Sequence, residues 1–502
     1  MKPARHLRAE VMSVQISERR IGSFPMNQGA ELPKNGNGNG DHLTSTVGRK
    51  GIAIVRAQIL KYWDRIRSSF WFLPSLMAVG AAVLAFASVA GDDVMMNRWF
   101  EDRGWAYSGG AQGASELLGT IAGSMITIAG VVFSMTLVAL SLASSQFGPR
   151  LLRNFMRDTA NQIVLGTFIA TFLYCLLVLR SIRYGEENAF VPHLSVTMGV
   201  LLALASLGVL IYYVHHVSLL IQADEIIARV GVELNEGLDL LFPEQIGQGA
   251  SPAAIEWSCC ALPDEFEREA RAVRAPEDGY LQLVDADALM RLATEEDAIF
   301  RVEYRPGHYI VRGSALARVW PAARLTDNLA SRIAAAFAQG VQRSAAQDIE
   351  LPIGQLVEIA VRALSPGVND PFTAITCVDR LGAGLCRLAQ RELPVPYRLD
   401  GQNQLRVVAP PITFSGILDA AFNQIRQNAR SSAPLSIRLL ETIAVVAQFT
   451  VRPEDRSALR HHADMILRGA RDGLPENEDR RAVEDRFLKA RRLLHGPERP
   501  DS

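Results

Sequence analysis

One apolar stretch of the chain carries polar and small residues at helical spacing. At about 100° per residue, one side of a helix through it collects a carboxylate, glycines and hydroxyl residues: Glu116, Gly119, Gly123, Thr127, Gly130, Ser134, Ser141 and Ser145. Hydroxyl oxygens can replace part of an ion's hydration shell, and carboxylates from several subunits can form an acidic ring at a pore mouth. These residues, called the small-residue strip below, therefore predict a pore wall in a homo-oligomer.

The small-residue strip also has a purely structural interpretation. It begins with Gly119-x-x-x-Gly123, a spacing that lets two membrane helices approach closely. Small side chains and hydroxyls are common at such contacts. The sequence leaves both interpretations open: the strip lines a permeation path, or it packs one helix against another.

A second set of polar residues stands in two unusual strings far along the chain. The first is Arg343-Ser-Ala-Ala-Gln-Asp348, and the second is Ala363-Leu-Ser-Pro-Gly-Val-Asn-Asp-Pro-Phe-Thr-Ala374. Ser365-Pro366-Gly predicts the end of a helix, and Asp370 before Pro371 predicts the N-cap of the next one. The candidate residues in these strings are Arg343, Gln347, Asp348, Ser365, Pro366, Asn369, Asp370 and Pro371.

Residue types that would indicate catalysis or metal binding do not form the required patterns. The pairs His215-His216 and His461-His462 are adjacent, so on a helix their rings point about 100° apart. Cys259-Cys260 has neither zinc nor redox spacing. No lysine lies between Lys61 and Lys489, which excludes a P-loop, Schiff-base or carrier lysine there. We expect no metal site, no cofactor and no catalytic residue, so an enzyme is the less favoured class.

Four stretches without charged residues dominate the remaining sequence. They cover residues 70–90, 117–149, 161–179 and 194–223, and each suffices for the roughly 20 helical residues that span a bilayer. We expect spans at about 70–90, 117–147, 161–180 and 194–221, within a transmembrane domain of residues 49–223. The lipid bilayer is therefore an expected partner.

Basic residues indicate how these spans are oriented. Arg and Lys are concentrated before the first span and between the second and third, whereas acidic residues balance them in the loops 91–116 and 180–193. Because cytoplasmic loops carry the excess of Arg and Lys, both termini are expected in the cytoplasm. Over the whole chain, 52 Lys and Arg stand against 53 Asp and Glu, a balance that argues against nucleic-acid binding.

The 502 residues are enough for about three domains. Residues 1–48 are rich in Asn and Gly and predict a disordered cytoplasmic tail. A linker helix is expected at 224–250, a small β-rich module at 251–325 and a helical cytoplasmic domain at 326–502. The fold class is thus a mainly α membrane protein, with a four-helix transmembrane domain followed by a cytoplasmic α+β region. The Gly and Pro-Gly rhythm of 279–316 resembles barrel-sandwich carrier domains, without their lysine.

Several strings together resemble a known family. Ser145-Gln-Phe-Gly-Pro-Arg150 and the two strings at 343–348 and 363–374 resemble bacterial predicted inner-membrane proteins built around a domain of unknown function. The resemblance covers about residues 68–469. It implies four spans in the inner membrane and a cytoplasmic C-terminal region. It brings no activity, ligand or catalytic residue.

Three classes of function follow from these patterns. The favoured one is an oligomeric ion channel or solute-permeation protein with a cytoplasmic gating region, because an anchor for a soluble domain needs one span and this chain has four. The alternative is a membrane-anchored sensor or scaffold whose cytoplasmic domain binds a partner. An enzyme without a recognisable site is the third.

Overall fold

The computed structural model describes residues 71–95, 109–147, 159–184, 190–220, 222–242 and 262–495. The expected tail at 1–48 lies outside these residues, as do most of the loops between the spans.

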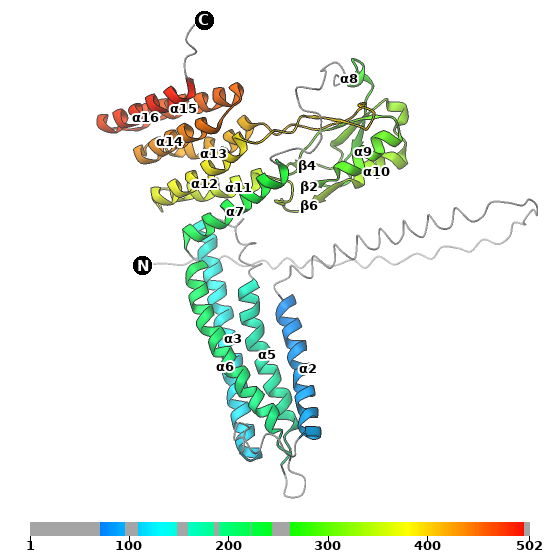
Figure 1. Cartoon of the computed structure of the whole chain (residues 1–502), viewed down its shortest axis with the longest axis vertical. Coiled ribbons are helices and arrows are strands. Elements are labelled where there is room, and N and C mark those ends of the chain that lie inside the picture. The colour runs from blue at the N-terminus through cyan, green and yellow to red at the C-terminus, as the bar shows by residue number, and fades with distance from the viewer. Residues whose placement is uncertain are drawn as a thin grey trace, which may run out of the picture. The chain divides into compact units, whose positions relative to one another are not determined.

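Four apolar helices form a bundle (Figure 1), and each is long and apolar enough to cross a bilayer. They are α2 (Phe72–Met95), α3 (Ala111–Phe147), α5 (Thr159–Ser181) and α6 (His193–Leu220). The four predicted spans are therefore confirmed, with α3 beginning six residues before its predicted start at 117.

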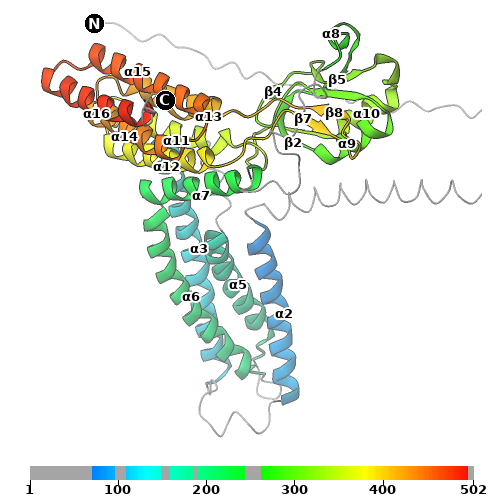
Figure 2. The same cartoon turned by 45° about the horizontal axis from the view of Figure 1, so that its top comes forward.

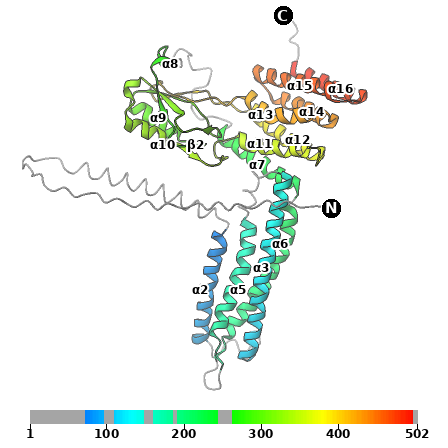
Figure 3. The ribbon, with the colours of Figure 1, turned by 180° about the vertical axis from the view of Figure 1, so that it is seen from behind.

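The third helix, α5, is the central one. Half of its apolar window is buried, against 17–22% for the other three spans. α5 contacts all three of its neighbours, and α3 also contacts α6 (Figure 3). Gly166 permits the contact with α2, because a Cβ there would lie 2.6 Å from the Sδ atom of Met77. The outer faces of α2, α3 and α6 are thus left to lipid or to other protein.

The helix after the bundle, α7 (Ala223–Leu241), belongs to a second core. Its buried residues Ile227, Val230, Leu234 and Leu238 pack into the helical domain, which we define as α7 together with α11–α16. Figure 2 shows α7 beside α11 (Glu350–Ala363) and α12 (Pro371–Ala389). α7 therefore differs from the expected linker at 224–250, because its apolar face is buried against these helices.

The rest of the helical domain is built from α13 (Phe414–Asn428), α14 (Ala433–Phe449), α15 (Pro453–Gly473) and α16 (Asn477–His495). Apolar residues from all of these helices form one continuous core. Close helix contacts depend on glycine at two places in α12. A Cβ on Gly382 would lie 2.4 Å from Thr442 of α14, and one on Gly384 would lie 2.8 Å from Leu234 of α7.

The chain also forms two small sheets, which we call the β region; most of their strands lie between α7 and α11, and two follow α12. The five-stranded sheet has the order β1 (Arg271–Arg274), β5 (Ala315–Trp320), β3 (Ile299–Val302), β8 (Leu405–Val408) and β7 (Tyr397–Leu399). The three-stranded sheet has the order β4 (Tyr309–Ile310), β2 (Gly279–Val284) and β6 (Phe337–Gly340). Three helices accompany them: α8 (Phe266–Glu269), α9 (Ala286–Glu295) and α10 (Asp327–Ala335).

The bounds of the β region differ from the expected module at 251–325. β6 follows α10, and the β7–β8 hairpin returns from the segment after α12, so the β region is discontinuous in sequence. β8 pairs in parallel with β3. This parallel pair, and the helix α9 between β2 and β3, do not match the all-antiparallel barrel-sandwich that the Gly rhythm resembles.

Candidate functional site

The small-residue strip lies on the outer side of α3, away from the other spans. Glu116, Gly119, Gly123, Thr127, Gly130, Ser134 and Ser141 are all exposed in the single chain; the side chain of Ser145 lies outside the described set. A Cβ added at Gly119, Gly123 or Gly130 would meet no described atom within 4 Å. Among the described residues, the strip therefore does not pack against the spans of its own chain.

The opposite side of α3 explains this orientation. Its buried residues recur at helical spacing and are apolar: Ala114, Leu118, Ala122, Met125, Ala129 and Val132. At about 100° per residue, they lie nearly opposite the strip. Burial of this apolar face against α5 and α6 thus turns the strip outward.

Polar groups on and beside the strip donate hydrogen bonds to their own helix. The Oγ1 atom of Thr127 donates to the carbonyl oxygen of Gly123 at 2.8 Å, and that of Thr120 donates to the carbonyl oxygen of Glu116 at 2.7 Å. Gln112 donates to the Glu116 carboxylate at 3.0 Å. A hydroxyl that has donated its proton keeps only acceptor capacity, so these oxygens can accept a further hydrogen bond but cannot donate one.

The last turn of α3 is bonded to the helical domain. Nη1 of Arg362, on α11, donates to the carbonyl oxygen of Ser144 at 3.0 Å. The last four carbonyls of a helix lack partners within the helix, and a cation is favourable at a helix C-terminus. The helix that carries the strip is therefore connected directly to α11.

The first string, residues 343–348, ties α11 to the β region. Arg343 donates two hydrogen bonds to the carboxylate of Asp348, at 2.6 and 2.8 Å, and that carboxylate is buried. The side-chain amide of Gln347 bonds both the N–H and the carbonyl of Val284 on β2. Arg305 adds an ion pair to Glu350 in the first turn of α11. The role of these residues in the structure is to fix the start of α11.

The second string forms the predicted corner between two helices. The Asp370 carboxylate accepts hydrogen bonds from the backbone N–H groups of Phe372 and Thr373, at 3.1 and 3.2 Å, and Pro371 is the first residue of α12. Asn369 has a φ of +49°, and the Ser365 hydroxyl donates to the carbonyl of Arg362. The predicted N-cap and proline are thus confirmed as local structure.

The two strings do not form one site. They lie at opposite ends of α11, which has 14 residues and is therefore about 21 Å long. One end carries Asp348 and the ties to the β region, and the other carries Arg362 and the tie to α3. α11 therefore connects the β region with the strip-bearing helix.

A buried polar network inside the bundle was not predicted from the sequence. Asp92, near the end of α2, is 3% exposed and accepts hydrogen bonds from the N–H groups of Leu194 and Ser195 and from the Ser195 hydroxyl. Tyr174 of α5 donates to the Ser195 carbonyl and bonds the Ser88 hydroxyl. The network caps α6 and joins three spans. In the sequence, Asp92 is simply an acidic residue at the start of a loop.

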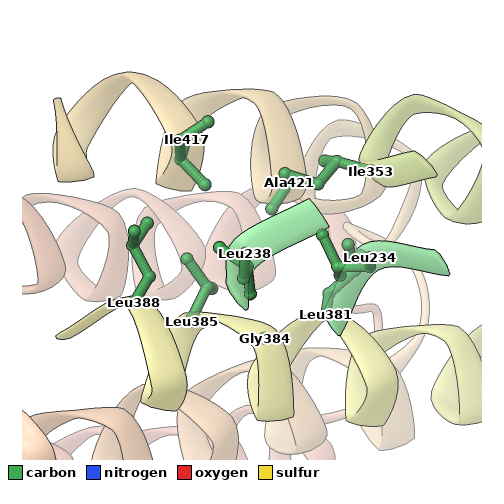
Figure 4. A pocket seen from close by; sticks show the side chains of 9 residues that line it. All are labelled: Leu234, Leu238, Ile353, Leu381, Gly384, Leu385, Leu388, Ile417 and Ala421. Carbon is green, nitrogen blue, oxygen red and sulfur yellow. The ribbon is translucent and has the colours of Figure 1, made fainter. Parts of the chain in front are cut away.

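A small apolar gap lies between helices of the helical domain. Figure 4 shows a gap lined by Leu234, Leu238, Ile353, Leu381, Gly384, Leu385, Leu388, Ile417 and Ala421, with a cavity of about 10 Å³. That is room for about one water molecule, and an apolar lining does not hold water. Within the same described ranges, no group of three or more His, Cys, Asp or Glu side chains could hold a metal ion.

Comparisons with known proteins agree with the bundle. Residues 67–445 match a family described as "Predicted membrane protein (DUF2254)". Uncharacterised proteins of Mycobacterium bovis and Mycobacterium tuberculosis are each 32% identical over 444 residues, which cover 86% of this chain and 82% of theirs. No solved structure matches the chain.

Proposed function

The chain belongs to the DUF2254 family of predicted membrane proteins, and on that premise we propose that it is a homo-oligomeric permeation protein for cations. In this proposal the small-residue strips of several α3 helices surround a path across the bacterial inner membrane. The termini and the region after α6 lie in the cytoplasm, in accord with the positive-inside rule.

The observation that carries the proposal is the exposure of the strip in the single chain. Gly119, Gly123 and Gly130 leave open space beside α3. Polar groups that face hydrocarbon are costly, so polar residues in membrane helices usually face protein or water. A neighbouring α3 could pack into the open space beside these glycines, and a water-filled lumen could solvate the polar groups on this face.

The connection through α11 supports the proposed cytoplasmic gate. One end of α11 bonds the last turn of α3 through Arg362, and the other end is held to the β region by Arg343–Asp348 and Arg305–Glu350. A shift of the β region would therefore displace the end of α3. We propose that such a shift opens or closes the path.

Cysteine scanning of reconstituted oligomers tests the proposal. In a background without the native cysteines, we expect Ser134→Cys to form disulfide-linked dimers and to react with a water-soluble thiol reagent. The control is Val83→Cys on the outer face of α2, which is 64% exposed in the single chain; it should do neither if that face meets lipid.

The same scan separates the proposal from a membrane-anchored scaffold. If the strips only pack together, Ser134→Cys would form disulfides and stay unreactive toward the water-soluble reagent. If the strip faces lipid, neither reaction would occur. Either result, together with a lack of cation flux in vesicles, would refute a permeation path along α3.

A further inference from the structure

The corner between α11 and α12, residues 365–372, exposes apolar side chains on a rigid support. Phe372 is 78% exposed and Val368 is 54% exposed; Pro366 and Gly367 are exposed beside them. The Asp370 cap and the Ser365 hydroxyl bond fix the backbone beneath these side chains. An aromatic ring held so far out of a well-capped corner is a feature of contact surfaces.

The corner begins at the end of a membrane span. Arg362, three residues before Ser365, donates its hydrogen bond to the Ser144 carbonyl in the last turn of α3. The end of α11 therefore lies beside the end of α3, two residues after the candidate span ends at Leu142, and the chain continues from there into the corner.

The far side of the corner lies near the end of a second span. α12 runs parallel to α7: a Cβ on Gly231 would lie 3.2 Å from Arg380, and one on Gly384 would lie 2.8 Å from Leu234. Because the two helices run in the same direction and contact each other a similar number of residues from their starts, the start of α12 lies beside the start of α7. α7 begins at Ala223, three residues after α6 ends at Leu220.

An electrostatic contact agrees with this alignment. Burial raises the pKa of the Cys377 thiol to about 12, and the charges of Asp224 and Asp370 contribute to the rise. Asp224 is at the start of α7 and Asp370 caps α12. Both helix starts therefore lie near Cys377, in agreement with the alignment.

We propose that the corner inserts Phe372 and Val368 into the surface of the bilayer, between the places where α3 and α6 leave it. The occupant of this apolar surface is phospholipid, at the boundary of head groups and acyl chains, where aromatic side chains are favoured. The neighbouring Asp224 and Glu225 are exposed and acidic, so attraction to anionic head groups does not drive the contact. Apolar burial drives it, and salt should affect it little.

Photocrosslinking of the full chain tests this contact. p-Benzoylphenylalanine replaces Phe372, an aromatic substitution at an exposed position, and the protein is reconstituted in phosphatidylethanolamine–phosphatidylglycerol vesicles. The control carries the same residue in place of Val451, which is 83% exposed. Val451 precedes Arg452, which donates a hydrogen bond to the Arg391 carbonyl just beyond the C-terminal end of α12. Phe372 lies at the N-terminal end of the same helix, whose 19 residues extend about 28 Å.

The expected result is a phospholipid adduct at position 372 and none at 451. The yield should change by less than about twofold between low and high salt. A crosslinked dimer at 372 would assign the corner to a second copy and overturn the proposal. Equal adducts at both positions, no adduct at 372, or loss of the adduct in high salt would also overturn it. Because the readout is a lipid adduct, it is independent of whether the protein conducts ions.

Discussion

Replacing Arg343 by alanine should destabilise the junction between the β region and α11. The side chain of Asp348 is 2% exposed, and Arg343 donates two hydrogen bonds to it at 2.6 and 2.8 Å. The carboxylate also packs against backbone, since a Cβ on Gly307 would lie 2.5 Å from its Oδ2 atom. Arg343→Ala therefore leaves a buried, unpaired charge, at a cost of about 3–5 kcal/mol in the free energy of unfolding.

A second substitution separates the charge from the packing. Arg343→Ala combined with Asp348→Asn removes the buried charge. The decrease in the free energy of unfolding should then fall to about 1–3 kcal/mol, the cost of an incompletely bonded amide. The control is Arg481→Ala, since Arg481 and Glu478 form an exposed pair with side chains 72% and 75% exposed. That substitution should change the free energy of unfolding by no more than about 1 kcal/mol.

Urea titration of the detergent-solubilised protein, followed by circular dichroism, measures these differences. If Arg343→Ala costs no more than Arg481→Ala, the Arg343–Asp348 pair does not fix the junction. The reasoning about a rigid connection through α11 would then fail.

Other predictions concern the strip and the helical domain. Glu116→Gln keeps the shape of the side chain and removes its charge, so cation conductance in planar bilayers should fall at low salt and less at high salt; an unchanged reversal potential across a salt gradient would refute Glu116 as a selectivity element. Gly123→Leu should leave the chain folded, because the space beside Gly123 is open, and should abolish the oligomer in size-exclusion chromatography; a normal oligomer would show that the strip is not an interface. Burial lowers the pKa of His462 below its usual 6.5, so the unfolded state binds the proton more readily and stability should decrease as pH falls below about 6.5. His462→Gln should reduce that decrease, whereas the exposed neighbour His461→Gln should not; equal acid sensitivity of both variants in thermal unfolding would contradict this assignment.

The parts of the fold that could be predicted depend on local properties of the chain. Charge-free runs longer than a bilayer is thick specify spans directly, and Asp370 followed by Pro371 specifies a helix start because the cap acts on the next three residues. The burial of α7 could not be foreseen in the same way. Its apolar face is visible in the sequence, but its partners Ile353 and Leu385 lie more than 100 residues away.

Long-range pairing limited the prediction of the β region and of the site. Residues 405–408 form an isolated extended segment in the sequence; in the structure they pair with the nearby β7 and, in parallel, with β3 about 100 residues earlier, which places both strands in the five-stranded sheet. The small-residue strip was visible as a pattern on one helix. Its direction was not, because that depends on which face α5 and α6 cover.

The length of α3 imposes a condition on the surrounding bilayer. Its candidate span of 32 residues is about 48 Å long, whereas the hydrocarbon core is about 30 Å thick. The 21 residues of the α2 window match that thickness at about 31 Å. Even at a tilt of about 40°, the upper end of the usual range, α3 would span about 37 Å. More than one turn of α3 must therefore lie outside the hydrocarbon, as the polar first turns at Gln112 and Glu116 can, or be covered by protein or by a locally thickened membrane. The environment of the ends of α3 should thus be sensitive to acyl-chain length.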